Sequence, residues 1–145
     1  MPVDVTTEIV INRPQGAVAA YASDPDHAPD WYVNIKSVEW KTPRPLSVGS
    51  QIAFVAKFLG RQMAYTYQIV ELVAGERLVM RTSEGLFPME TQYRWEPMGP
   101  DITRMVLRNH GSPSGFSRLV APFISRAMGN ANRKDLARLK QILEA

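Results

Sequence analysis

Residues 115–143 read GFSRLVAPFISRAMGNANRKDLARLKQIL, a long stretch with the apolar spacing of a helix. Two apolar stripes follow this stretch, one through Leu119, Phe123 and Ala127 and the other through Leu136, Leu139 and Leu143. At about 100° per residue, the two stripes are displaced around the helix axis by roughly a third of a turn. We therefore expect one amphipathic helix that bends near Pro122 or Gly129 and covers a curved surface.

The residues before this helix alternate between apolar and polar side chains, which is the pattern of half-buried strands. The strand patterns cover residues 5–11, 35–41, 51–59, 63–72, 77–83, 87–96 and 102–110. Short turn sequences join most of them, so consecutive strands are expected to be antiparallel neighbours. Two short helices, which begin near Pro14 and Pro25, follow the first strand. This order predicts an α+β fold, with a curved seven-stranded antiparallel sheet under the C-terminal helix.

Length and composition are those of one globular domain that covers residues 1–145. Apolar residues make up 45% and charged residues 21% of the chain, and no stretch reaches the roughly 20 apolar residues of a membrane-spanning helix. The start, MPVDVTTE, lacks the pattern of a secretory signal. There is no cysteine, so a disulfide framework and a thiolate metal site are excluded. We expect a cytoplasmic protein.

The net charge of +3 is distributed unevenly. From Arg104 onward there are eight Lys or Arg residues against Asp135 and Glu144. A basic segment can attract nucleic acid or an anionic membrane. The chain has no zinc-finger spacing and no aromatic RNA-binding motif, so we expect a solvated helix face and no nucleic-acid partner. Transient contact with a membrane surface, through Arg118 and the apolar residues near it, is a further expectation.

Several segments together resemble the helix-grip, START-like superfamily, also called SRPBCC domains. This superfamily includes the birch-pollen-allergen fold and the polyketide cyclase/dehydrase-like proteins. The segments are EIVINRPQGAVAAYASDPDHAPDWY at residues 8–32, LSVGS at 46–50, YQIVELVAGERLVMR at 67–81 and NANRKDLARLKQILE at 130–144. Their order and spacing cover nearly the whole chain. The resemblance implies a cavity between the long helix and the sheet that holds an apolar ligand.

The alternation of each strand predicts which side chains face that cavity. The candidate ligand-binding residues on the strands are Phe54, Phe58, Tyr65, Tyr67, Phe87, Met89, Thr91, Tyr93, Met105, Leu107 and Asn109. The candidates on the helices are Trp31, Phe116, Leu119, Val120, Phe123 and Ala127. Simple core packing is the alternative for each of them. Tyrosine and threonine among apolar residues favour a binding cavity, because buried hydroxyl groups need partners.

Candidate catalytic groups are few. His27 lies among Asp24, Asp26 and Asp30, but this loop lacks the glycine and glutamate of a calcium-binding loop, so we expect turn and capping chemistry and no metal. His110 ends the last strand, where it is expected to cap the sheet edge. If the protein is an enzyme, the candidates for proton transfer are His110, Tyr93, Tyr65 and Tyr67.

The sequence therefore predicts a domain that binds a hydrophobic or amphipathic small molecule, such as a lipid, polyketide or isoprenoid, without a cofactor. Two alternatives stay open. One is an enzyme similar to the polyketide cyclases and dehydratases, and the other is an interaction or co-chaperone-like module with a vestigial cavity. The sequence does not identify the ligand or the oligomeric state.

Overall fold

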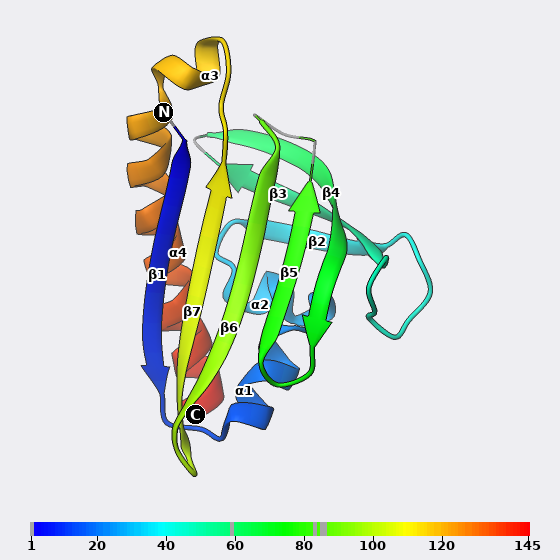
Figure 1. Ribbon diagram of the computed structural model, residues 1–145, viewed down its shortest axis with the longest axis vertical. Helices are drawn as coiled ribbons and strands as arrows, with labels where there is room; N and C mark the ends of the chain where they lie inside the picture. Colours follow the sequence, from blue (N-terminus) through cyan, green and yellow to red (C-terminus); the bar gives the residue numbers. More distant parts are fainter. Residues whose placement is uncertain (1, 59, 83, 85–86) are drawn as a thin grey trace.

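A computed structural model describes residues 2–58, 60–82, 84 and 87–145; the side chains of Phe58, Phe116 and Ser117 lie outside this description (Figure 1). The strands are β1 (Val3–Ile11), β2 (Ile35–Trp40), β3 (Gln51–Phe58), β4 (Arg61–Val73), β5 (Arg77–Thr82), β6 (Met89–Gly99) and β7 (Ile102–Gly111). The helices are α1 (Gln15–Ala22), the 3₁₀ turn η1 (Pro25–His27), α2 (Ala28–Trp31), α3 (Phe116–Leu119) and α4 (Ala121–Glu144). The predicted α+β fold is confirmed.

The seven strands form one antiparallel sheet in the order β1-β7-β6-β5-β4-β3-β2. β2, β3, β4, β5 and β6 each pair with the next strand along the chain. Short turns join most of these pairs, whereas residues 41–50 connect β2 to β3. β1 closes the order by pairing with β7. The sheet curls strongly, so that β2 and β3 pass behind the other strands, on the side where α4 lies (Figure 1). The inner face of the sheet is therefore concave.

The two short helices after β1 begin where the sequence predicts. Pro14 is the N-cap of α1, with extended backbone angles. Asp24 is the N-cap of η1, and its Oδ1 accepts a hydrogen bond from the backbone N–H of Asp26 at 3.0 Å. Such a cap satisfies an N–H group that would otherwise be unpaired at the helix start. These turns place Trp31, which is fully buried, under the inner face of the sheet.

The C-terminal segment corrects the prediction of one bent helix over residues 115–143. α3 ends at Leu119, and a new helix, α4, begins at Ala121. Val120 separates them with φ −101° and ψ 7°. Pro122 lies in the first turn of α4. The backbone N–H groups of a first turn have no partner within the helix, so a proline there costs no hydrogen bond and does not bend the helix. Gly129 is buried inside α4 next to Val5 of β1, and the helix continues through it.

The main core lies between α4 and the sheet near the C-terminal half of the helix. Leu136 and Leu139 are buried there, at 1% and 0% exposure, as their stripe predicts. They belong to one cluster with Trp31, Trp95 and Met105. Large apolar side chains in contact stabilise such a layer by removing their surface from water. The N-terminal half of α4 belongs to a separate cluster, in which Ala121 and Ile124 pack with Val3 and Phe87, and it also lines a cavity.

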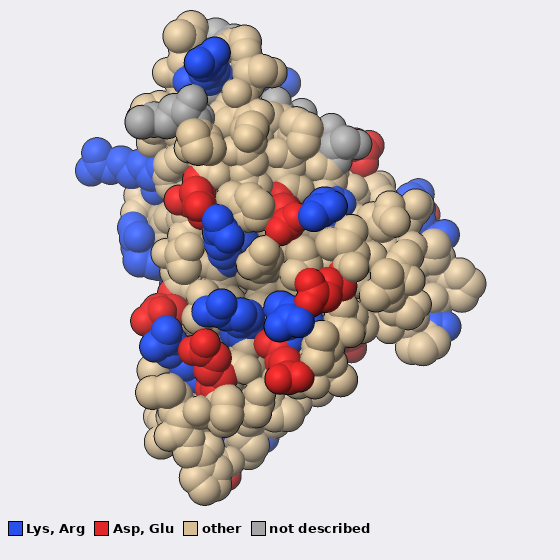
Figure 2. Space-filling view, viewed as in Figure 1, with Lys and Arg blue, Asp and Glu red and all other residues tan. Residues whose placement is uncertain are grey.

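The outer face of the sheet carries charged side chains in alternating signs (Figure 2). Arg108 forms a two-pronged ion pair with Asp4, at 2.9 and 2.7 Å. Arg104 lies 3.1 Å from Glu96, and Arg77 lies 2.5 Å from Glu71. Paired charges of this kind keep one face of an antiparallel sheet in water while the other face is buried. Within the described residues, no helix is both long and apolar enough to cross a membrane.

Candidate binding cavity

The cavity has a volume of about 160 Å³ and lies between the concave face of the sheet and the N-terminal half of α4. β3 and β4 contribute Phe54, Ala56, Met63, Tyr65 and Tyr67. β5, β6 and β7 contribute Met80, Thr82, Met89, Thr91, Tyr93 and Asn109. α4 contributes Ile124, Met128, Ala131, Asn132 and Asp135. Glu84 is exposed and also lines the cavity, so the cavity reaches the surface beside the connection between β5 and β6.

Aromatic rings form the wall that β3 and β4 provide. The ring of Tyr67 lies edge-on to those of Phe54 and Tyr65, with centroids 5.9 and 5.7 Å apart. Edge-to-face packing of this kind is favourable between aromatic rings. Burial raises the pKa of Tyr65, and the nearby Tyr67 raises it further. Burial also raises the pKa of Tyr67. Both tyrosines are therefore neutral hydrogen-bonding groups at neutral pH.

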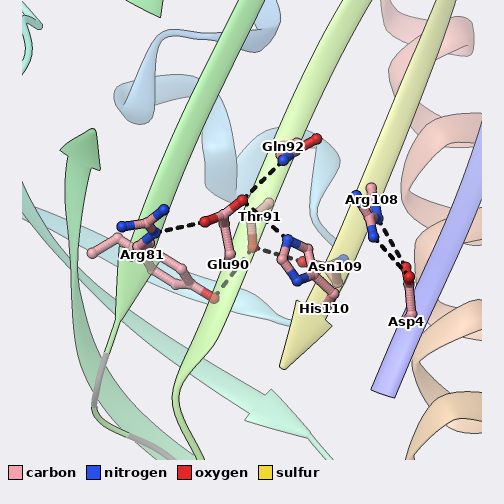
Figure 3. Close-up of polar contacts among 9 residues, drawn as sticks. Asp4, Arg81, Glu90, Thr91, Gln92, Arg108, Asn109 and His110 are labelled. Carbon is pink, nitrogen blue, oxygen red and sulfur yellow. Dashed lines mark hydrogen bonds and ion pairs between the residues drawn. The ribbon is translucent and has the colours of Figure 1, made fainter. Parts of the chain in front are cut away.

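Thr91 forms a polar group in the centre of the concave face. Its hydroxyl donates a hydrogen bond to Oδ1 of Asn109 on β7 at 2.6 Å and lies 3.4 Å from the Tyr67 hydroxyl (Figure 3). Thr91 and Asn109 are directly opposite each other in the β6–β7 pairing. Because buried polar groups need partners, this network accounts for polar side chains in an otherwise apolar wall.

A pair of tyrosines crosses the end of the cavity near α2. The hydroxyl of Tyr32, at the C-terminus of α2, lies 2.5 Å from the hydroxyl of Tyr93 on β6. Burial raises the pKa of Tyr32, and the neighbouring Tyr93 and Asp135 raise it further. Burial also raises the pKa of Tyr93. The two hydroxyls stay protonated, and one donates to the other.

Asp135 is a buried carboxylate on the α4 side of the cavity, with 2% exposure. Its Oδ1 accepts a hydrogen bond from the backbone N–H of Val33 at 2.9 Å. Within the described residues, no Lys, Arg or His forms an ion pair with it. Burial raises the pKa of Asp135 to about 6, and the Val33 hydrogen bond opposes this only in part. The group can therefore hold or release a proton close to neutral pH.

His110 lies on the outer face of the sheet, on the side away from the cavity. Its Nε2 is 3.0 Å from Oε1 of Glu90 (Figure 3). The same oxygen accepts a hydrogen bond from Gln92 at 2.9 Å, and Oε2 of Glu90 accepts one from Arg81 at 2.6 Å. Burial acts to raise the pKa of Glu90, but these hydrogen bonds outweigh it and hold the pKa at about 2. The structure thus places His110 in a hydrogen-bonded network on the outer face, outside the cavity lining.

The other sequence candidates divide into three groups. Phe54, Tyr65, Tyr67, Phe87, Met89, Thr91, Tyr93 and Asn109 line the cavity. Trp31, Met105 and Leu107 are fully buried in the core and do not line it. Leu119 and Phe123 are 79% and 63% exposed, and Val120 and Ala127 also lie outside the cavity wall. The predicted side chains of Phe58 and Phe116 fall outside the described residues.

The stripe of α4 that lines the cavity differs from the predicted one. It runs through Ile124, Met128, Ala131 and Asp135, with spacings of four, three and four residues, and this spacing was a usable signal. The break at Val120 separates Leu119 from α4, so a stripe drawn through Leu119 does not continue along one helix. Asn132 and Asp135 were not among the sequence candidates.

His27 and its acidic neighbours make contacts that hold the loop between α1 and α2 in place. The imidazole stacks on the ring of Tyr21 at 4.0 Å, and the Asp26 carboxylate binds Arg44 at 2.8 Å and the indole N–H of Trp40 at 2.8 Å. In the described part of the chain, His, Asp and Glu residues form no group of three that could hold a metal ion.

Comparison with known proteins agrees with this architecture. Residues 2–144 match the family described as polyketide cyclase / dehydrase and lipid transport. A START superfamily protein from Mycobacterium smegmatis has a TM-score of 0.85 at 14% identity, over 97% of each chain. The Zhui aromatase/cyclase from Streptomyces sp. R1128 has a TM-score of 0.86 at 14% identity, over 99% of this chain and 94% of that one.

A plant protein has the same architecture. The major latex-like protein 151 of Panax ginseng has a TM-score of 0.78 at 11% identity, over 97% of this chain and 96% of that one. At these identities, the structural likeness establishes the fold. No curated protein matches the sequence. The match over residues 2–144 and the shared fold confirm the helix-grip resemblance. The chain belongs to the polyketide cyclase / dehydrase and lipid transport family.

Proposed function

We propose that this protein binds an apolar or amphipathic small molecule in the cavity between the sheet and α4. The observation that carries the proposal is the cavity itself, whose wall is mainly apolar and aromatic with a few polar groups at defined positions. Binding sites for small molecules have this composition, in which the apolar surface supplies affinity and the polar groups fix orientation. The family description, which includes lipid transport, supports the same class of ligand.

An enzymatic function is the second candidate, and Asp135 favours it. A buried carboxyl group with a pKa of about 6 is suited to take up and release a proton at neutral pH. It lies in the same cavity as the paired hydroxyls of Tyr32 and Tyr93. The Zhui protein, which has the same fold, is described as an aromatase/cyclase. A reaction of that class would place the reacting carbon chain between Asp135 and the tyrosines.

Native mass spectrometry of the purified protein tests the proposal. We expect a non-covalent adduct with the mass of a small organic compound, which is lost when the protein is denatured. An added compound that is recovered with a changed mass would favour the enzymatic candidate. A protein that carries no adduct after purification and takes up no apolar compound from solution would contradict the binding function, and would favour the vestigial cavity of an interaction module.

A further inference from the structure

Two polar side chains of α4 lie next to each other at one end of the cavity. Asn132 and Asp135 are three residues apart, which places them on one face of the helix. Both line the cavity, and their exposures are 4% and 2%. Polar side chains at this depth are normally matched by partners within the protein. A polar atom of this pair that has no partner in the protein therefore indicates which kind of ligand atom would bind there.

The pair is incompletely satisfied. The amide nitrogen of Asn132 is buried and makes no hydrogen bond to any of the described residues. Asp135 accepts one hydrogen bond, from the backbone of Val33, and has acceptor capacity left on its carboxylate. An unpaired buried donor costs free energy, and a ligand atom that accepts its hydrogen removes that cost. The cavity therefore offers one free donor and one free acceptor side by side.

This combination restricts the chemistry of the polar end of a ligand. A hydrocarbon leaves the Asn132 amide unpaired. A carboxylate would bring a second negative charge next to Asp135, which is unfavourable in a buried site. An ammonium group has no lone pair for the Asn132 amide. A hydroxyl group fits both, because its oxygen accepts from Asn132 while its hydrogen is donated to Asp135.

The volume of the cavity restricts the size of the apolar part of the ligand. Its volume of about 160 Å³ is below the roughly 300–1,000 Å³ of sites for larger ligands, and is close to that of an engineered apolar cavity of about 150 Å³ that binds benzene. The rings of Phe54, Tyr65 and Tyr67 form its far wall. A single ring fills this space, whereas an extended acyl chain would protrude from the opening beside Glu84.

We infer that the cavity selects a single-ring compound with a hydroxyl group, held between the Asn132 amide and the Asp135 carboxylate. This assignment rests on the proposed binding function and adds a ligand class and a polar subsite to it. The ring contacts the aromatic wall, and the hydroxyl sets its direction. Asn132 and Asp135 are then the residues that determine specificity.

Binding of p-cresol and p-xylene tests this assignment, since the two differ by a hydroxyl in place of a methyl group. Affinities are measured by NMR titration for the wild type, for Asn132→Leu, and for Asn130→Leu, which changes an exposed asparagine on the same helix. We expect Asn132→Leu to lower the ratio of p-cresol to p-xylene affinity at least tenfold, because only p-cresol loses a hydrogen bond. Asn130→Leu should leave the ratio unchanged.

A second variant covers the case in which Asn132→Leu does not fold. Asp135→Asn keeps an oxygen for the Val33 N–H but places an amide N–H₂ group beside the ligand. It should lower the ratio of p-cresol to p-methylanisole affinity, because the methyl ether has no hydrogen to donate. If both compounds bind and neither variant changes these ratios, the subsite is wrong and the binding function stands. If the wild type binds neither p-cresol nor p-xylene and carries no co-purified compound, the binding function itself is wrong.

Discussion

Replacing Asp135 by Asn will change the free energy of unfolding in a pH-dependent way. The difference between Asp135→Asn and the wild type will be about 2–3 kcal/mol more favourable to the variant at pH 7.5 than at pH 4. The reason is the pKa of Asp135, which burial raises from 3.8 to about 6. Between these two values, the folded protein holds a proton that the unfolded chain has released. Raising the pH through this window therefore destabilises the folded wild type, and asparagine has no proton to lose.

Urea denaturation of the wild type and of Asp135→Asn at pH 4, 5, 6 and 7.5 measures this difference. Glu90→Gln is the control of opposite sign, because the pKa of Glu90 is lowered from 4.5 to about 2. Its carboxylate contributes stability above pH 4.5 that is lost as the pH falls toward 2, so Glu90→Gln will be the less stable protein at pH 7.5. A pH-independent difference between Asp135→Asn and the wild type would show that Asp135 is not a buried, unpaired carboxylate.

Replacing Ala131 by Leu will lower the affinity for p-xylene at least tenfold. Ala131 lines the cavity from α4, and a larger side chain there occupies the space that the ligand needs. The free energy of unfolding should stay the same or rise, since filling a cavity adds apolar contacts. Loss of binding without loss of stability is the signature of a blocked site. It differs from the effect of a variant that removes binding because it unfolds the protein.

Ala137→Leu is the matched control for Ala131→Leu. It makes the same change on the same helix, at an exposed position that faces away from the cavity. Its affinity for p-xylene should equal that of the wild type, and any small change in helix propensity is shared by the two variants. If Ala131→Leu binds p-xylene as well as Ala137→Leu does, the ligand lies outside the described cavity.

The fold could be predicted because it depends on local patterns. The alternation in β6 identified Met89, Thr91 and Tyr93 as inward-facing, since a strand turns successive side chains to opposite faces. Short turns are also a local feature of the sequence, and they predict that consecutive strands are antiparallel neighbours. Asp24 and Pro25 likewise marked the start of η1, because capping depends on neighbouring residues.

The helical side of the cavity could not be predicted to the same extent. The prediction used the stripe through Leu119 and Phe123, and both side chains are exposed. The break at Val120 puts Leu119 on α3, so the stripe does not continue along one helix. Asp135 was not a sequence candidate, and its hydrogen-bond partner, the backbone N–H of Val33, is 102 positions away in the sequence. Similarly, the alternation of β7 puts His110 on the face opposite to Asn109, but its partner Glu90 on β6 follows from the register of the folded sheet. Such contacts between distant residues arise only in the folded chain.

Methionine methyl NMR tests the central claim most directly, because four methionines mark the cavity from different elements. Met63, Met80, Met89 and Met128 line it, from β4, β5, β6 and α4 respectively. Met98 is 55% exposed near the C-terminal end of β6, and Met105 is fully buried in the core outside the cavity wall. In a titration with p-cresol, we predict shifts of the four lining methyl groups while the signals of Met98 and Met105 stay in place. Shifts confined to Met98, or no shifts at saturating p-cresol, would contradict the claim that this cavity binds the ligand.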